Sequence, residues 1–311
     1  MDQIFQASRQ WENIQNRWIT EDAAVDLTNL KSDPRNYKLS LWDPTTNGVR
    51  YLKTLTYHLG MQLGPQEWER IRRTPNREIG NPITVRCEGE SISLDDLQAT
   101  YELGFIEREI SLGGARIVEI GAGYGRTCHM IMSNHEISRY CIVDLKNTLE
   151  LSNAYLRRAL DDAHFKLIDF IPVESLELGT LKSEQFDLCI NIHSMTEMRP
   201  ETVSAYLGLI DETCSAFYVK NPVGKYIDQT LDGYVQGEEV VQMALENGPL
   251  RHLVDIHDSQ AVQAAVPAFI DGYRPGEAWE CVGDSRALPW SYLWQALYRK
   301  AQRRPAARRT T

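Results

Sequence analysis

The segment Ala115–Arg126, with the sequence ARIVEIGAGYGR, constrains the fold more than any other part of the chain. An apolar run ends at Ile120 and breaks into three glycines at alternate positions, Gly121, Gly123 and Gly125. Helix-forming sequence follows directly. This order of strand, glycine turn and helix brings backbone N–H groups and a helix N terminus close to a ligand. The segment therefore predicts a ligand-binding turn at the end of a sheet strand.

Strand-like apolar runs and helical segments alternate from residue 116 onward. We expect strands at 116–120, 139–144, 165–171, 186–192, 216–220, 252–257 and 278–282. We expect helices at 125–134, 148–160, 200–213, 238–245, 261–269 and 290–300. Alternation of this kind predicts an α/β fold in which a mostly parallel sheet carries helices on both faces.

The first third of the chain is predicted to be helical. Apolar residues spaced three and four apart, with Trp11 and Trp18 on one stripe, predict an amphipathic helix within residues 1–30. Further helices are expected at 48–63 and 66–74. We favour packing of the tryptophan stripe on the chain's own core over a lid above the ligand site or a contact in a homodimer.

Loop-rich sequence at 74–92, with a short strand expected near 83–87, marks the predicted domain boundary. We assign residues 1–90 to an N-terminal helical region that supplies lid, acceptor or dimer contacts. Residues 91–300 form the predicted ligand-binding core, and its first helix, at 94–109, begins with a capping motif. The basic tail at 301–311 is predicted to be disordered.

Composition excludes several classes of partner. The formal net charge of −10 over 311 residues argues against nonspecific nucleic-acid binding and against anionic membranes, because both require a basic face. No apolar run approaches the ~20 residues of a membrane span, and no secretory segment opens the chain. The six cysteines form no C-x-x-C pair, so we expect a reduced, cytoplasmic compartment.

Two ligand-binding patterns compete for the glycine turn. A dinucleotide turn, G-x-G-x-x-G/A, requires a small residue at the position of Arg126. The pattern acidic-x-G-x-G-x-G fits from Glu119 to Gly125 and resembles the first motif of class I S-adenosylmethionine-dependent methyltransferases. An acid suits the ammonium and sulfonium of that cofactor, whereas a pyrophosphate favours a bare helix N terminus. We therefore prefer S-adenosylmethionine, with S-adenosylhomocysteine as product.

Residues at the carboxyl ends of the strands complete the predicted cofactor site, because ligands of such sheets bind there. Asp144 ends the second strand and is predicted to bind the ribose hydroxyls, although an acid before a helix can also serve as its N-cap. The adenine is expected near the end of the third strand. The predicted cofactor-binding residues are Glu119, Gly121, Ala122, Gly123, Tyr124, Gly125, Asp144, Leu145, Ile171 and Asn191.

Polar residues at Asn191–Glu197 follow the fourth strand and predict the acceptor end of the site. His193 can take a proton from an acceptor hydroxyl, and Glu197 can orient His193 or the acceptor. The alternative is that His193 and Asn191 are structural hydrogen-bonding groups at a strand end. Asn191, Asn221 and His257 are further acceptor-binding candidates. One His and one Glu, four residues apart, are too few ligands to predict a metal site.

Four segments resemble a narrower bacterial family of sugar O-methyltransferases. They are VEIGAGYGRT at 118–127, IVDL with LSNAYL at 142–156, FDLCINIHSMTEM at 186–198 and FYVKNP at 217–222. The resemblance implies a seven-stranded, Rossmann-like methyltransferase core and a small-molecule acceptor, either a sugar or a glycosylated natural product of the kind found in antibiotic biosynthesis. N-methylation of an amino sugar or aminoglycoside is the alternative. A nicotinamide oxidoreductase and a non-catalytic scaffold are less favoured.

Overall fold

The computed structural model describes residues 7–17, 27–174, 181–233 and 237–301. The chain divides into two compact units, Met1–His58 and Leu59–Thr311. The second unit contains the sheet, both hydrophobic cores and all the site residues discussed below.

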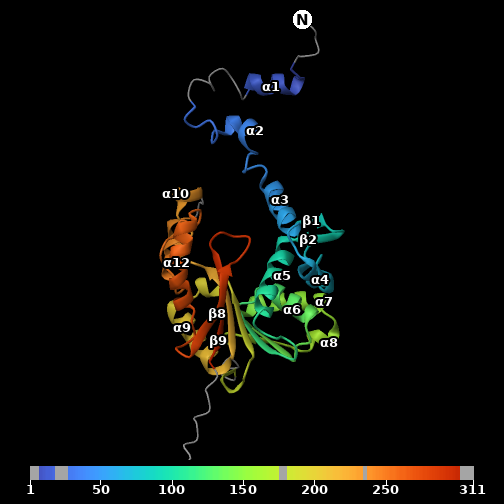
Figure 1. The fold of residues 1–311 in the computed structure, drawn as a ribbon, viewed down its shortest axis with the longest axis vertical. Coiled ribbons are helices and arrows are strands. Elements are labelled where there is room, and N and C mark those ends of the chain that lie inside the picture. The colour runs from blue at the N-terminus through green and yellow to red at the C-terminus, as the bar shows by residue number, and fades with distance from the viewer. Residues whose placement is uncertain (1–6, 18–26, 175–180, 234–236, 302–311) are drawn as a thin grey trace, which may run out of the picture. The chain divides into compact units, whose positions relative to one another are not determined.

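Seven strands form the main sheet of the described chain, in the order β5-β4-β3-β6-β7-β9-β8 (Figure 1). They are β3 (Arg116–Ile120), β4 (Arg139–Asp144), β5 (Ile168–Pro172), β6 (Leu188–Ile192), β7 (Ala216–Pro222), β8 (Trp279–Arg286) and β9 (Leu293–Lys300). Strands β5, β4, β3, β6 and β7 pair in parallel, and β9 is antiparallel to both of its neighbours. The predicted seven-stranded, mostly parallel α/β sheet is confirmed.

The strand order reverses between β3 and β6. From β3 the chain moves outward through β4 to β5, and it then returns to place β6 on the other side of β3. Two neighbouring strands whose connections leave in opposite directions open a crevice at their carboxyl ends. The glycine turn follows β3, so this crevice lies directly beside it.

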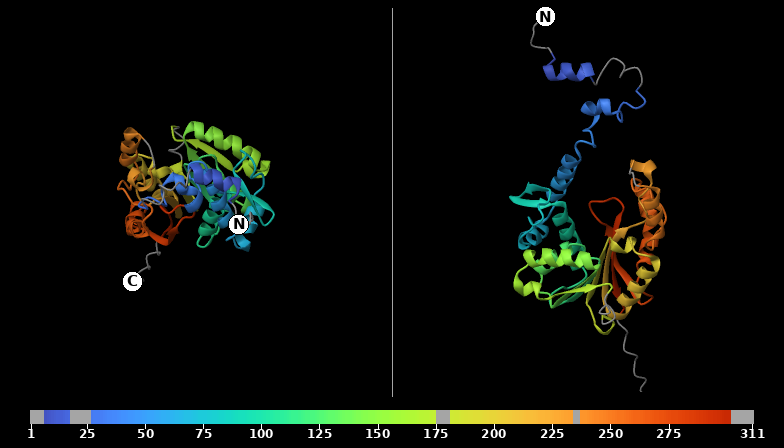
Figure 2. Two further views of the ribbon diagram at one scale, coloured as in Figure 1. Left: turned by 90° about the horizontal axis from the view of Figure 1, so that it is seen from above. Right: turned by 180° about the vertical axis from the view of Figure 1, so that it is seen from behind.

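Helices cover both faces of the sheet, as Figure 2 shows. One core packs side chains of α5, α6 and α7 against the sheet, and the other packs α9 and α12 against the opposite face. The helices of this unit are α4 (Pro65–Arg73), α5 (Leu94–Glu107), α6 (Arg126–Asn134), α7 (Lys146–Ala159), α8 (Asp162–Phe165), α9 (Pro200–Thr213), α10 (Gln229–Asp232), α11 (Glu238–Glu246) and α12 (Ser259–Gly272). Ser93 and Asp96 form the predicted capping box of α5.

Two sequence predictions in the last quarter of the chain are wrong. Within 290–300 the structure has no helix: Leu293–Lys300 form strand β9, which lies between β7 and β8, and the residues before it belong to the β8–β9 loop. Leu293–Tyr298 are all buried, and a strand buried on both faces is a nearly continuous apolar run whose periodicity does not distinguish it from a buried helix. Residues 252–257 were expected as a strand, but Leu253 makes only an isolated bridge to Lys225.

A short β-hairpin precedes α5. Strand β1 (Thr84–Cys87) confirms the strand expected near 83–87, and it pairs with β2 (Glu90–Ser93), which the sequence analysis missed. The hairpin and α4 belong to the same compact unit as the sheet. The compact units therefore divide at His58, earlier than the boundary expected in 74–92.

The first unit contains α1 (Arg9–Arg17), a 3-10 turn (Pro34–Asn36), α2 (Tyr37–Ser40) and most of α3 (Gly48–Gly60). Within its unit Trp11 is 40% exposed, and the predicted packing of the tryptophan stripe stays a prediction. Trp18 and the predicted tail at 301–311 lie outside the described residues, apart from Ala301.

Candidate active site

The three glycines of the turn serve different purposes. Gly121, Gly123 and Gly125 all have positive φ angles, of 74°, 59° and 95°. A Cβ atom at Gly121 would overlap Ser194, and one at Gly125 would overlap Leu156 of α7. A Cβ at Gly123 would meet nothing within 4 Å. Packing therefore explains two of the glycines, while the third leaves its backbone open to a ligand.

A cavity of about 480 Å³ lies beside the turn, at the point where the strand order reverses. We call it the switch-point cavity. Its volume is in the range of small-molecule and cofactor sites. Its walls come from the ends of β3 and β4, the start of α7, the segment after β6 and one face of α9. The residues that line it are Ile120, Gly121, Gly123, Val143, Asp144, Leu145, Thr148, Val173, Ser194, Glu197, Met198, Thr202 and Tyr206.

Asp144 joins the turn to the wall of the switch-point cavity. Its Oδ2 accepts a hydrogen bond from the Gly123 N–H at 3.1 Å, and its Oδ1 accepts one from the Leu145 N–H at 2.7 Å. Burial raises the pKa of Asp144, and these backbone hydrogen bonds partly offset the shift. Because a carboxylate offers about four acceptor positions, the group can also accept bonds from two ligand hydroxyls.

Glu119 lies beneath the turn rather than in the cavity wall. It is 1% exposed, and the Tyr140 hydroxyl donates to its Oε2 at 2.7 Å. Burial raises the pKa of Glu119 to about 7. In the structure this carboxyl therefore supports the strand below the turn, and its predicted contact with the cofactor stays a prediction.

The other predicted cofactor residues lie at different depths. Leu145 lines the switch-point cavity and is 58% exposed. Ile171 is buried in the core, and Val173, two residues later, lines the cavity instead. Ala122 is half-buried in the turn and packs against the core of α5–α7.

Asn191 ties three strand ends together. Its amide donates to the Ile120 carbonyl at 2.9 Å and to the Ser194 Oγ at 2.7 Å, and its carbonyl accepts from Asn221 at 2.9 Å. Both asparagines are fully buried. This geometry favours the structural interpretation of Asn191 and Asn221, because their side chains already bridge β3, β6 and β7.

His193 has an unusual backbone conformation at the end of β6. Its φ of 65° lies in the left-handed region, which His adopts more readily than most residues but at some cost. Its N–H donates to the Lys220 carbonyl at 2.8 Å, which extends the β6–β7 pairing by one residue. Burial and the neighbouring charge of Lys220 lower the pKa of His193 to about 4. The imidazole is therefore neutral at neutral pH.

Glu197 and His193 do not share a helical face, although they are four residues apart. The residues between them form a 3-10 turn, Ser194–Thr196. Glu197 is exposed and lines the switch-point cavity. In the described ranges, His, Cys, Asp and Glu side chains do not gather in groups of three or more that could hold a metal ion.

His257, another predicted acceptor-binding residue, lies in the loop before α12. Its backbone N–H donates to the Asp255 carboxylate.

Three charged residues gather near His193, two of them buried and one partly buried, and the sequence analysis did not predict this grouping. Glu102 of α5 accepts from Lys220 Nζ at 2.7 Å and from Arg126 Nη2 at 2.8 Å. Glu102 and Lys220 are each 1% exposed. Burial raises the pKa of Glu102, but the two cations outweigh burial and the net shift is downward. We call Glu102, Lys220 and Arg126 the charge cluster.

The charge cluster connects the residue that follows the glycine turn with the strand residue beside His193. Arg126 is the first residue of α6, directly after the glycine turn, and Lys220 lies beside His193 on β7. The only sequence signal was a lysine at the end of an apolar strand. Its partner on α5 is 118 residues away in the chain, so no local pattern connects the two.

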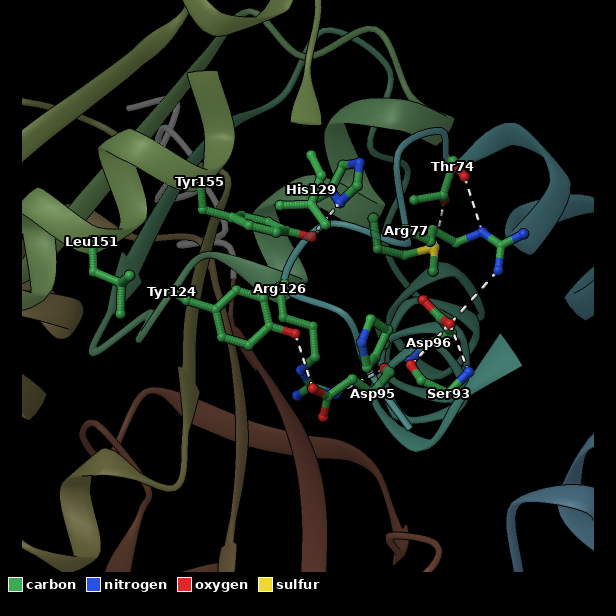
Figure 3. Close-up of a pocket in the computed structure, with 15 residues that line it drawn as sticks. Thr74, Arg77, Ser93, Asp95, Asp96, Tyr124, Arg126, His129, Leu151 and Tyr155 are labelled. Atoms are coloured by element: carbon green, nitrogen blue, oxygen red, sulfur yellow. Dashed lines mark hydrogen bonds and ion pairs between the residues drawn. The ribbon is translucent and has the colours of Figure 1, made fainter. Parts of the chain in front are cut away.

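A second cavity, of about 390 Å³, lies where Tyr124 leaves the turn (Figure 3). The Tyr124 hydroxyl donates to Asp95 at 3.0 Å, and its ring packs edge-on against Tyr155. Tyr155 in turn contacts His129 Nδ1 at 3.0 Å. Tyr124, predicted to bind the cofactor, thus points to the α5–α7 side and not into the switch-point cavity.

No family model matches the chain, and no curated protein matches it. Among solved structures, the chain is similar to the methyltransferase domain of bacterial CtHen1, with 10% identity over 66% of this chain and 99% of that one, at a TM-score of 0.47. It is similar to the mitomycin 7-O-methyltransferase MmcR, with 11% identity over 88% and 70%, at 0.42. It is also similar to the magnesium protoporphyrin IX methyltransferase of Synechocystis PCC 6803, with 10% identity over 83% and 100%, at 0.44.

At these identities the likeness concerns the fold alone. The strand order and the antiparallel β9 of this chain define the class of fold, a Rossmann-like methyltransferase sheet with helices on both faces. Among the described helices, none combines the length and apolar character needed to cross a bilayer.

Proposed function

We propose that the chain is an S-adenosylmethionine-dependent methyltransferase. The observation that carries the proposal is the open backbone of Gly123 at the wall of the switch-point cavity, with its N–H held by Asp144. Positive φ and open space also occur at Gly89 in the β1–β2 turn, but the open side of Gly123 lies in the wall of a cavity, where a ligand can approach the backbone closely.

The residues of the cavity fit the parts of this cofactor. Asp144 would accept hydrogen bonds from the ribose hydroxyls. Leu145, Val173 and Tyr206 would enclose the adenine between apolar and aromatic surfaces. The amino-acid part would lie along the turn. When bound, the cofactor supplies a methyl group on a sulfonium, and S-adenosylhomocysteine is the product.

The acceptor, in this proposal, is a hydroxyl of a sugar or glycoside held at the ends of β6 and β7. His193 takes the hydroxyl proton, since its imidazole is neutral at neutral pH and Lys220 lies beside it. Glu197, at the cavity wall, orients the acceptor. Most of the rate enhancement comes from holding the acceptor oxygen in line with the methyl group.

Cofactor binding is tested first by isothermal titration with S-adenosylhomocysteine. We expect binding in the micromolar range or tighter, and no heat at high micromolar concentration would reject the proposal. Gly123→Ala should weaken binding by roughly tenfold or more, because its Cβ enters the space beside the turn and adds strain at positive φ.

Gly89→Ala is the matched control for this variant. Gly89 has a φ of 82° and open space around its Cβ position, but it lies in the β1–β2 turn. The Gly89→Ala variant therefore introduces similar backbone strain away from the switch-point cavity. Equal losses of affinity in the two variants would show that Gly123 acts through stability alone.

The methylated atom distinguishes the two acceptor classes. Mass spectrometry of products from sugar and amino-sugar acceptors should show an O-methyl group. A product methylated only on nitrogen would favour the alternative, an amino sugar, for which the net charge of −10 is suitable.

A further inference from the structure

Three aromatic rings form a row at the carboxyl end of β7. Tyr226 lies in the loop after β7, while Trp290 and Tyr292 lie in the loop between β8 and β9. That loop rises above the sheet in Figure 1, at the edge where the parallel strands end. The Val223 N–H donates to the Tyr292 carbonyl at 3.0 Å, which fixes the two loops together.

The rings are stacked rather than packed at random angles. Tyr226 and Tyr292 have centroids 4.3 Å apart and planes 24° apart. Trp290 continues the row, with its centroid 6.4 Å from that of Tyr292 and its plane 28° away. Trp290 is 39% exposed, so the end of the row faces solvent. We call these three residues the aromatic row.

We propose that the aromatic row binds a ring of the acceptor that presents an apolar face, either a pyranose or an aromatic ring. This inference rests on the proposed function and names the chemistry of its acceptor. The face of an aromatic ring carries negative partial charge, so it attracts the C–H groups on one side of a sugar ring and stacks with other flat rings. An exposed tryptophan at the end of a stacked row provides such a face.

The position of the row suits an acceptor that also reaches His193. The Lys220 carbonyl accepts the His193 N–H, and Val223, three residues further along the chain, donates to Tyr292. Three extended residues span roughly 10 Å. One ring bound on the row and a hydroxyl at His193 can therefore belong to the same mono- or disaccharide-sized molecule.

The test measures binding of three probes to the full chain saturated with S-adenosylhomocysteine. Methyl β-D-glucopyranoside carries only the sugar ring, phenol only the aromatic ring, and phenyl β-D-glucopyranoside both. We expect at least one to bind in the millimolar range or tighter by isothermal titration. Trp290→Ala should weaken that binding at least tenfold, and Trp290→Phe, which keeps a ring, should retain most of it.

Leu288→Ala is the matched control, because Leu288 is 43% exposed in the same loop and carries no ring. It should leave probe binding unchanged. The affinity for S-adenosylhomocysteine should be the same in all three variants, so a failure of the cofactor site is seen separately. Binding of none of the probes, or equal binding by Trp290→Ala and the unaltered chain, would overturn the assignment. The probe that binds best identifies which ring the row prefers.

Discussion

His193 is where local backbone strain and the proposed chemistry coincide. Its left-handed conformation follows a buried strand, and its pKa is lowered by burial and by Lys220. If His193 is the base, His193→Ala should reduce turnover by about a hundredfold or more, with cofactor affinity unchanged. Unchanged turnover would assign the residue a structural role.

The pH dependence provides a separate check on His193. A base must be neutral to accept a proton, so its activity is lost as pH falls through its pKa of about 4. An unperturbed histidine would titrate near 6.5. We therefore expect kcat/KM to show no loss from this group between pH 5.5 and 8. An acidic limb near pH 6.5 that vanishes in His193→Gln would contradict this.

Glu119 makes a prediction about stability. Its pKa of about 7 in the folded protein exceeds the ordinary value of 4.5. The folded state thus binds the Glu119 proton more tightly than the unfolded state does. This proton binding stabilises the folded state fully below pH 4.5, and the stabilisation is lost as pH rises through 7. A pKa shift of this size corresponds to a difference of roughly 3 kcal/mol in the free energy of unfolding.

Glu119→Gln removes this titration while it keeps an acceptor for the Tyr140 hydroxyl. Between pH 5 and pH 8 the unaltered chain should therefore lose stability that the variant does not lose. The free energy of unfolding of the variant minus that of the unaltered chain should rise over this range. Urea denaturation at the two pH values measures the difference. A gap that is the same at both values would mean that Glu119 is ionised throughout.

At the scale of elements, the charge cluster joins α5, α6 and β7 inside the protein. Glu102→Gln leaves Lys220 and Arg126 buried without their carboxylate. Because an unpaired buried charge is costly, the variant should lose roughly 3–5 kcal/mol of stability. The double variant Glu102→Gln with Lys220→Met should lose less, since one of the two cations is gone.

Glu107→Gln on the same helix is the control for Glu102. Glu107 pairs with Arg70 and His135, but its side chain is 24% exposed. Water compensates part of that loss, so the effect should be near 1 kcal/mol. Equal effects at the two positions, measured by urea denaturation, would show that the cluster is not a special feature of the core.

At the scale of the whole molecule, the two units differ in how much they bury. Every buried hydrophobic side chain of the described residues lies at Leu59 or later, as does the switch-point cavity. A chain of residues 48–311 keeps α3 whole. We expect it to fold with a Tm within about 4 °C of the full chain and to bind S-adenosylhomocysteine equally well. A large drop in either would show that residues 1–47 belong to the folded core or to the cofactor site.

The proximity of several predicted cofactor residues to one cavity followed from the sequence, while their contact with a cofactor stays a prediction. The turn, Asp144 and Leu145 lie next to one another in the structure because each follows a strand, and parallel strands end at one edge. Ile171 lies in the core at the end of β5, whereas Val173, just beyond the strand, lines the cavity. Glu119 belongs to the same motif as the glycine turn, and the structure buries its carboxyl against the Tyr140 hydroxyl.

The proposed acceptor end depends on contacts that no local pattern encodes. Lys220 meets a carboxylate on α5, and Tyr292, on which Trp290 stacks, meets Tyr226 across more than sixty residues of chain. Part of the difficulty was the error at 290–300. Reading that segment as a helix hid the loop between β8 and β9, on which two of the three rings lie.

The sequence by itself determined the strand–glycine turn–helix unit, the α/β class and the edge of the sheet at which the switch-point cavity lies. These follow from the period of apolar residues and from the φ angles that only glycine adopts easily, which are properties of neighbouring residues. Tertiary structure alone decided the place of β9, the depth of Glu119, the charge cluster and the aromatic row. Each of these is a choice between partners that are distant in the chain, and burial of charge and apolar surface makes that choice.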